Sequence, residues 1–212
     1  MTFKKSKSII LQLCADTGSD TKPYQDDPNY EVILVGKNIG VENYNPPDNV
    51  RGIIANPVCL EFSRARVGGR PRNTTNGMEL VEHCIRIINK AKPAWWVIEN
   101  PAMGALRNYL GKPAATYQPY NYGSPWTKMT ALWGHFNMPP FVYKKWEDLE
   151  GLYNNTLWIK HDRNKPSLIH QHKSAINHIE EFLPFIDKIK TDSEFRSLCS
   201  QKFSNKFKEY NP

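Results

Sequence analysis

The nine residues PAWWVIENP, from Pro93 to Pro101, indicate the fold of this chain more clearly than any other stretch. The apolar run from Ala94 to Ile98 has the length and composition of a buried β-strand. An acid, an amide and a proline follow it at once, as Glu99-Asn100-Pro101. A wholly apolar strand that ends in polar residues is typical of a parallel sheet that is buried on both faces.

Other short apolar runs of strand length lie on both sides of this stretch. They are Ser8–Cys14, Glu31–Val35, Arg51–Ala55 and a run near Ala131–Trp133. Before Pro93 the apolar residues fall on one helical stripe, and Thr75 and Asn76 are expected to cap that helix at its start. Strands that alternate with helices predict a parallel sheet with right-handed crossovers, so we expect an α/β, Rossmann-like fold.

The chain changes character near residue 140. The residues after this point are first mixed and irregular, then show helical spacing from Ser174 to Lys190, and end in a Phe-rich amphipathic segment. We therefore expect a core domain in residues 1–140 and a small C-terminal helical annex in residues 141–212.

The composition bounds the class of protein. The chain has 212 residues, of which 40% are hydrophobic, enough for one domain with a buried core. Its formal net charge of +7 favours an anionic partner, with nucleic acid first. The apolar run after the basic N-terminal residues is too short for a signal peptide or a membrane span. We therefore expect a cytoplasmic protein with no membrane partner.

The cysteines and histidines argue against a disulfide-stabilised protein and against a metal-binding protein. The four cysteines are far apart and form no C-x-x-C pair, which indicates free thiols in a reducing compartment. The histidines His161, His170, His172 and His178 lack cysteine or acidic partners at ligand spacing. We therefore predict no metal site.

Reactive or ligand-binding residues follow three of the expected strands. They are Asp16 and Gly18, Asn56 and Cys59, and Glu99 and Asn100. The carboxyl ends of parallel strands meet at one edge of the sheet, where ligands and catalytic groups gather. The sequence therefore predicts an active site at this edge.

Three motifs occur in order along this edge. They are A-x-P-x-C-x-x-F-S from Ala55 to Ser63, I-E-N-P from Ile98 to Pro101, and Y-G-x-P-x-x-K-x-T from Tyr122 to Thr130. Together they resemble the cytosine-5 DNA methyltransferase family, above all its short phage-type members. PAWWVIENP and YGSPWTKMTALWG are similar to the strings PEWWALENP and YGxPxTKxTALWG of those proteins.

The resemblance covers roughly residues 9–136. It implies a Rossmann-like sheet of the S-adenosylmethionine-dependent methyltransferase kind. Residues 1–140 would then be the catalytic core, and residues 141–212 a small recognition segment with closing helices. The protein would act in the cytoplasm of a bacterium or of a phage-infected host cell.

The resemblance also implies catalytic roles for three residues. Cys59 would add to carbon 6 of a flipped cytosine in DNA, because that addition makes carbon 5 nucleophilic. Glu99 would hold and protonate ring nitrogen 3 as charge builds there. Lys128 stands where the family has the first arginine of its Q-x-R-x-R motif, and its cation would contact the base and favour the thiolate.

Two further sets of residues follow from the same resemblance. The residues expected to bind S-adenosylmethionine are Cys14, Ala15, Asp16, Thr17, Gly18, Glu42, Asn56 and Pro57. The residues expected to bind DNA are Ser63, Arg64, Arg66, Arg70, Arg72, Asn100 and Thr130. Backbone N–H groups of the turn after the first strand can face the cofactor's carboxylate. The arginine-rich loop, with Gly68-Gly69 as its hinge, can close over the phosphates while a base is flipped.

The chain departs from the family at positions that bear on activity. Val58 stands where the family has a proline before the cysteine, and Gly36 stands where the second strand usually ends in an acid. Asp16 and Ser19 replace two glycines of the first motif. A large target-recognition insert is also missing, so either specificity is relaxed, a partner protein reads the DNA, or the substrate is small.

Three other interpretations of these residues stay open. One is a catalytically weak or inactive methyltransferase-like protein that binds DNA. Another is a pyrimidine-nucleotide modifying enzyme of the thymidylate-synthase type, which also adds a cysteine to carbon 6 but uses a folate. A third is an amino-methyltransferase, with Asn56-Pro57 as the start of an N-P-P-F-like box, although the residues after Pro57 supply no aromatic ring to stack on the base.

Overall fold

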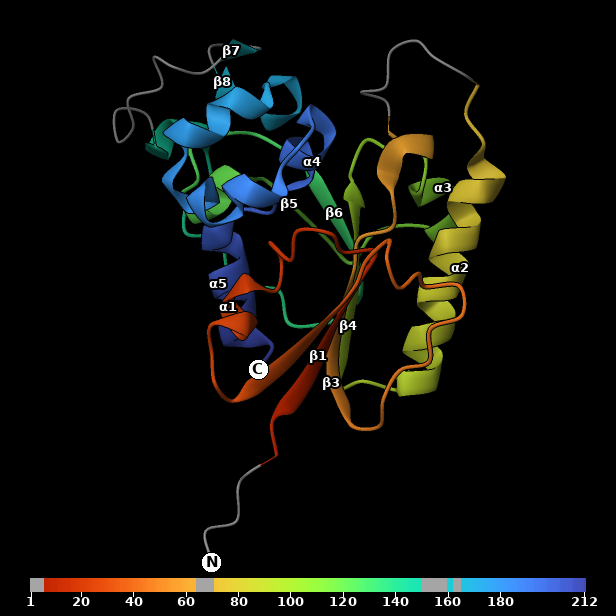
Figure 1. Ribbon diagram of the computed structural model, residues 1–212. Helices are drawn as coiled ribbons and strands as arrows, with labels where there is room; N and C mark the ends of the chain where they lie inside the picture. Colours follow the sequence, from red (N-terminus) through yellow and green to blue (C-terminus); the bar gives the residue numbers. More distant parts are fainter. Residues whose placement is uncertain (1–5, 64–70, 150–159, 162–164) are drawn as a thin grey trace, which may run out of the picture.

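The computed structural model describes residues 6–63, 71–149, 160–161 and 165–212 (Figure 1). A six-stranded sheet crosses the middle of the described chain in the order β2-β1-β3-β4-β6-β5. Its strands are β1 (Ser8–Leu13), β2 (Tyr30–Val35), β3 (Val50–Ala55), β4 (Trp95–Pro101), β5 (Ala115–Tyr117) and β6 (Thr130–His135). A separate two-stranded ribbon pairs β7 (Lys160–His161) with β8 (Lys165–Pro166). The sheet with its helices confirms the predicted α/β, Rossmann-like fold.

The sheet is parallel only in part. β2, β1, β3 and β4 pair in parallel, but β6 runs antiparallel to both β4 and β5. The expectation of a wholly parallel sheet was therefore wrong for the strand near Ala131–Trp133. β4 and β6 pair tightly at Gly134, where a Cβ atom would lie 2.1 Å from the carbonyl oxygen of Trp96. Only glycine fits at that position.

Helices cover the two faces of the sheet unequally (Figure 1). The long helix α2 (Thr74–Ala91) covers one face, and α1 (Lys22–Gln25) and α5 (Gln201–Tyr210) cover the other. Leu11, Ile53 and Ile98 belong to the apolar core on the α2 side. Their neighbours Ile10, Ile54 and Val97 belong to the core that contains Phe203 and Phe207 of α5. Side chains alternate along a strand. In β1, β3 and β4, residues that follow Ile10, Ile54 and Val97 by an even number of positions therefore face α5, and those that follow by an odd number face α2.

Helix α2 begins slightly earlier than predicted. Its N-cap is Asn73, whose side chain accepts a hydrogen bond of 3.1 Å from the backbone nitrogen of Asn76, so Thr75 and Asn76 lie inside the helix. The helix ends at Lys92 in a left-handed conformation, directly before Pro93, as expected.

The C-terminal annex is built mainly of short 3₁₀ helices. They are η3 (Trp146–Leu149), η4 (Leu168–His170), η5 (Lys173–His178) and η6 (Glu180–Lys188), followed by the α-helices α4 (Asp192–Ser197) and α5. Pro184, which interrupts the helical spacing of Ser174–Lys190, lies inside η6. Figure 1 shows this blue segment beside the carboxyl ends of the strands. In the described parts of the chain, no helix has the length and apolarity that a bilayer span requires.

An apolar cluster and a shared carboxylate are among the contacts that attach the annex to the core. An apolar cluster joins Trp126, from the loop before β6, to Phe182, Phe195 and Leu198 of the annex. The buried carboxylate of Glu181 accepts hydrogen bonds from the hydroxyl of Ser124 and, at 2.7 Å, from the backbone nitrogen of Gln201 at the start of α5. The annex is therefore packed onto the sheet through α5 and through the loop that precedes β6.

Candidate active site at the carboxyl ends of the strands

Three polar side chains lie at the carboxyl ends of neighbouring strands. Gln12, Asn56 and Glu99 follow Ile10, Ile54 and Val97 by two residues, so alternation turns all three toward the α5 side. The sequence predicted that the strand before Glu99 ends at Ile98. In the structure β4 continues through Pro101, and Glu99 pairs with Leu132 of β6. Glu99 is therefore held inside a strand and not in a loop.

A hydrogen-bond network joins these side chains to Asp20. The amide Nδ2 of Asn56 donates to Glu99 Oε2 at 3.3 Å and to Asp20 Oδ1 at 3.2 Å. Gln12 Nε2 donates to Asn56 Oδ1 at 3.1 Å and to Asp20 Oδ2 at 3.2 Å. The hydroxyl of Thr21 donates to Gln12 Oε1, which orients the glutamine amide. Two carboxyl groups from separate segments thus meet on one asparagine.

The two carboxyl groups border a small cavity between the sheet and α5. Its apolar walls include Val97, Leu132 and Phe203, and it has room for about one water molecule. Burial raises the pKa of Glu99 and of Asp20, because a low-dielectric site disfavours the charged form. The nearby cation of Lys128 opposes both shifts.

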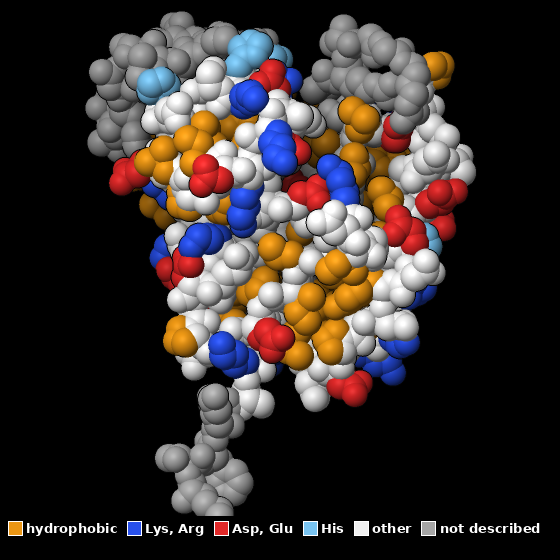
Figure 2. Space-filling model, viewed as in Figure 1, with side chains coloured by type: hydrophobic (Ala, Val, Ile, Leu, Met, Phe, Trp, Pro, Cys, Tyr) orange, Lys and Arg blue, Asp and Glu red, His pale blue; other side chains and the backbone are white. Residues whose placement is uncertain are grey.

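Lys128 lies just before β6 and connects this site to the annex. Its ammonium Nζ donates to the carbonyl oxygens of Ser197 and Leu198, at 3.2 Å each, after the last turn of α4. Its backbone nitrogen donates to Gln118 Oε1 at 2.9 Å. The lysine cation is thus held beside Asp20, Glu99 and Cys59, on whose pKa values it acts. Figure 2 shows basic and acidic side chains side by side between the C-terminal segment and α2.

Cys59 begins the 3₁₀ turn η1 (Cys59–Glu61) and is exposed. Its carbonyl oxygen accepts hydrogen bonds from the backbone nitrogens of Phe62, at 2.9 Å, and Ser63, at 2.7 Å. Partial burial of the thiol raises the pKa of Cys59, as does the carboxyl of Glu99, whereas Lys128 lowers it. The three predicted catalytic residues therefore lie within electrostatic reach of one another.

The turn before Cys59 has the shape that a proline would impose. Val58 has a φ of −52°, inside the range to which a proline ring restricts the backbone. The carbonyl oxygen of Pro57 accepts a hydrogen bond of 2.9 Å from Nδ2 of the buried Asn100. Although Val58 is not a proline, the backbone of this turn therefore keeps a conformation that a proline would adopt.

The loop after β1 explains the glycine at the end of β2. A Cβ atom on Gly36 would lie 2.3 Å from the carbonyl oxygen of Ala15 and 2.8 Å from Asp16 Oδ1, so no side chain fits there. Asp16 itself accepts a hydrogen bond of 3.1 Å from the backbone nitrogen of Lys37 and forms an ion pair with its ammonium. The carboxylate of Asp16 therefore lies directly beside the end of β2.

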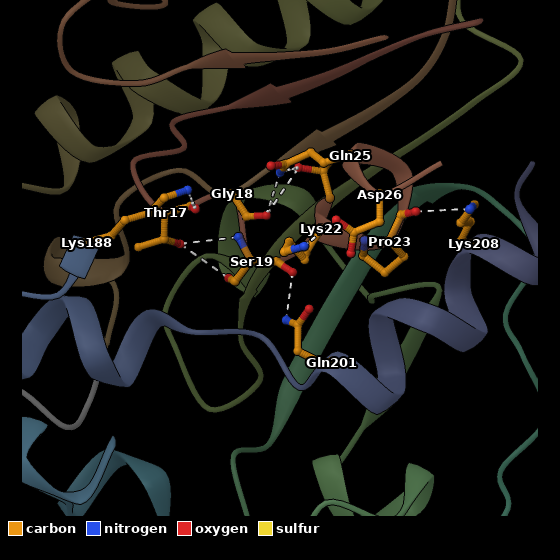
Figure 3. Close-up of polar contacts among 11 residues, drawn as sticks. Thr17, Gly18, Ser19, Lys22, Pro23, Gln25, Asp26, Lys188, Gln201 and Lys208 are labelled. Atoms are coloured by element: carbon orange, nitrogen blue, oxygen red, sulfur yellow. Dashed lines mark hydrogen bonds and ion pairs between the residues drawn. The ribbon is translucent and has the colours of Figure 1, made fainter. Parts of the chain in front are cut away.

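Cys14 and Gly18 both adopt left-handed conformations in this loop, with φ of 57° and 74°. Lys188 of η6 donates to the carbonyl oxygen of Thr17 at 3.0 Å, and Gln25 donates to that of Gly18 at 2.9 Å (Figure 3). The backbone N–H groups of residues 16–18 have no acceptor within the described ranges. Another expected cofactor residue, Glu42, lies on the α2 side, where Arg86 donates to its carbonyl oxygen.

The residues expected to bind DNA fall into three groups. Arg72 is exposed and donates to the carbonyl oxygen of Ser63 at 2.9 Å, so both lie beside Cys59. Asn100 and Thr130 are each only 1% exposed, and Thr130 donates to the carbonyl oxygen of Lys128 at 3.0 Å. These two side chains are in the framework that supports the site. The remaining three, Arg64, Arg66 and Arg70, lie outside the described residues.

Two residues of this network were not foreseen. Asp20 lies several residues after β1 and reaches Asn56 only because the loop folds back, and no sequence pattern indicates that contact. Gln12 had a usable signal, since a glutamine inside the apolar run SIILQLC must find a partner when it is buried. It is 2% exposed. Within the described ranges, no group of three or more acidic, histidine or cysteine residues could hold a metal ion.

No protein-family model matches the chain, and no curated protein sequence matches it. Among solved structures, the chain is similar to a candidate DNA modification methyltransferase encoded within a prophage (E. coli), with a TM-score of 0.41 and 13% sequence identity. That match covers 76% of this chain and 53% of the other, so this chain spans about half of the other protein's length.

Proposed function

We propose that this protein transfers a methyl group from S-adenosylmethionine to carbon 5 of cytosine in DNA. The observation that carries the proposal is the convergence of a thiol, a partly buried acid and a cation at the carboxyl edge of the sheet. Cys59 follows β3, Glu99 lies near the carboxyl end of the neighbouring strand β4, and Lys128 precedes β6. Both Glu99 and Lys128 act on the pKa of Cys59 in addition to the effect of burial.

The thiol would start the reaction. Carbon 5 of cytosine is a weak nucleophile, but addition of the Cys59 thiolate to carbon 6 converts the ring to an enamine that can attack a methyl group. Because burial raises the pKa of this thiol, its thiolate is scarce in the free protein. Lys128 lowers the pKa of the thiol and so increases the fraction of thiolate.

The acid would stabilise the ring while the thiol adds. Negative charge develops at ring nitrogen 3 during the addition, and a protonated Glu99 can donate its proton there. Burial raises the pKa of Glu99, which favours the protonated form that this step needs. After methylation, the proton on carbon 5 leaves to water, Cys59 is eliminated, and the proton on nitrogen 3 returns to Glu99.

Two residues would position these groups. Asn56 donates to the Glu99 carboxyl at 3.3 Å and fixes its direction. Asn100 donates to the carbonyl oxygen of Pro57 at 2.9 Å and thereby holds the turn that carries Cys59. The buried position of Asn100 favours this role over direct contact with DNA.

The loop after β1 fits the proposed cofactor in two respects. The backbone N–H groups of residues 16–18 have no acceptor among the described residues, and such a turn can bind the carboxylate of an amino acid. Asp16 places a carboxylate at the end of β2, where it can accept hydrogen bonds from ribose hydroxyls. S-adenosylmethionine would supply an electrophilic methyl group on its sulfonium.

Charge and apolar exposure support DNA as the substrate. From Asn100 to Trp146 the chain contains no acidic residue, but it contains Arg107, Lys112, Lys128, Lys144 and Lys145. Val58 and Leu60, which flank Cys59, are exposed, as is Met129 beside Lys128. Basic residues can bind phosphates, and exposed apolar side chains can contact bases that have left the stack.

The proposal is tested by incubating the protein with methyl-labelled S-adenosylmethionine and duplex or single-stranded DNA, and by mapping the modified base. We expect label on carbon 5 of cytosine from intact protein and none from Cys59→Ala. Label on an exocyclic amino group would favour the amino-methyltransferase interpretation. Absence of transfer at saturating cofactor, with DNA still bound, would favour the inactive DNA-binding protein.

A further inference from the structure

We propose that Asp20 carries the negative charge of an Asp20–Glu99 carboxyl pair, so that Glu99 keeps the proton. The inference rests on the proposed function, in which Glu99 donates that proton to the cytosine ring. Asp20 would be a positioning residue: it touches Asn56 and acts on Glu99 without contacting the substrate. Its own carboxyl would neither gain nor lose a proton during the reaction.

The geometry places the two carboxyl groups on one donor. Asn56 Nδ2 donates to Asp20 Oδ1 at 3.2 Å and to Glu99 Oε2 at 3.3 Å. An amide NH₂ group has two hydrogens, so it can serve both oxygens at once. Two carboxyl groups that share one partner in a buried site cannot both ionise readily, because their charges repel each other.

Asp20 accepts more hydrogen bonds than Glu99 does. Asp20 accepts from the side chains of Asn56, Gln12 at 3.2 Å and Ser19 at 3.3 Å, and a further hydrogen bond from Cys199 also lowers its pKa. Glu99 accepts from Asn56 alone within the described part of the chain. Hydrogen bonds from donors stabilise an ionised carboxylate, so the negative charge is favoured on Asp20 and the proton on Glu99.

The groups that face the pair are consistent with one shared negative charge. Lys128, before β6, supplies one cation. The other ionisable groups around the pair are Tyr117 of β5 and the thiols of Cys59 and Cys199. Burial raises the pKa of each of these three groups, and nearby acids raise it further. Burial raises the pKa of Glu99, and the charge of Asp20 raises it further, against the opposing effects of Lys128 and Asn56.

A direct test reads the protonation state without cofactor or DNA. Glutamate labelled with carbon-13 at the side-chain carboxyl is incorporated, and Glu99→Gln identifies the Glu99 resonance. In the intact protein we expect this resonance at the position of a protonated acid at neutral pH. In Asp20→Asn we expect it at the ionised position, because the repelling charge has gone. An ionised Glu99 in the intact protein, or a protonated one that Asp20→Asn leaves unchanged, would overturn the inference.

Two further variants guard against misfolding and misassignment. Ser19→Ala removes one donor to Asp20 but keeps its charge, so we expect a smaller shift of Glu99 toward the ionised form. Glu181→Gln is the matched control, because burial raises the pKa of Glu181 as well but this residue binds Ser124 and the start of α5. It should remove a different resonance and leave that of Glu99 in place. Failure of either expectation counts against the inference.

Methyl transfer supplies a second readout that a merely structural role would not produce. Asp20→Asn lowers the pKa of Glu99, so its loss of activity should grow as the pH rises and vanish at acid pH, where Glu99 is protonated in either protein. An equal loss at every pH would contradict the inference. If the proposed methyl transfer fails altogether, the carboxyl resonances still decide the protonation of the pair.

Discussion

The proposed acid and the proposed nucleophile are held in opposite ways. Glu99 is part of strand β4, is paired to β6, and is joined through Asn56 to Asp20 and Gln12. Cys59 lies on an exposed 3₁₀ turn that is held by backbone hydrogen bonds and, in the residue before Val58, by the side chain of Asn100. The surroundings of the acid are therefore fixed by strand pairing and a hydrogen-bond network, whereas the turn that carries the thiol is open to solvent.

The largest expected effect is on the exposed side of this comparison. Cys59→Ser should reduce methyl transfer by more than about 10,000-fold, because a hydroxyl cannot replace the thiolate in the addition step. DNA binding, measured by fluorescence anisotropy, should change by less than about twofold, since no phosphate contact is lost.

Cys84→Ala is the matched control for the loss of a thiol. Cys84 lies on the buried face of α2, and its sulfur is 3.7 Å from the sulfur of Cys14. We expect a modest loss of stability and retained methyl transfer. Equal losses of activity in both cysteine variants would remove the distinction between a reactive and a structural thiol.

The next effect is on the buried side. Glu99→Gln keeps the shape of the side chain but cannot donate the required proton, so methyl transfer should fall by about 100- to 10,000-fold. The melting temperature should stay the same or rise, because an ionisable group has been removed from a buried site. Retained activity in this variant would show that the acid is structural.

Asn100→Ala tests the hydrogen bond that joins β4, the strand of Glu99, to the turn that carries Cys59. Loss of its hydrogen bond to Pro57 should cost about 1–3 kcal/mol in the free energy of unfolding, because a buried carbonyl loses its donor. Methyl transfer should fall as the turn that carries Cys59 loosens. Chemical denaturation and initial rates measure the two effects separately.

The control for that variant is Asn73→Ala at the start of α2. Loss of this helix cap should cost about 1 kcal/mol with little change in the methyl transfer rate. Comparable rates in the Asn73 and Asn100 variants, at matched stability, would mean that Asn100 does not position the thiol.

The smallest effect is expected at Val58. Because its φ of −52° already suits proline, Val58→Pro should leave methyl transfer unchanged and stabilise the fold by about 0.4–1 kcal/mol, chiefly by restricting the unfolded chain. Denaturation midpoints measure this change. A clear loss of stability would show that the backbone at Val58 does not have a proline-like conformation.

The sequence predicted the strands and the residues at their ends because apolar runs and polar breaks are local signals. It did not predict β5, whose three residues carry too little pattern, or the reversed direction of β6. Asp20 was missed because its partner Asn56 is 36 residues away in the chain. Asn100 and Thr130 were expected to bind DNA, but β4 continues through Pro101 and β6 begins at Thr130, so pairing buries both side chains.

The central claim, attack of Cys59 on carbon 6 of cytosine, is tested most directly with DNA whose cytosines carry fluorine at carbon 5. After methyl transfer, carbon 5 has no proton to release, so the bond between the cysteine sulfur and carbon 6 should persist. We predict a covalent protein–DNA adduct that requires S-adenosylmethionine and maps by mass spectrometry to Cys59. An adduct on another residue, or methylation of ordinary cytosine without any adduct on the fluorinated base, would contradict the account.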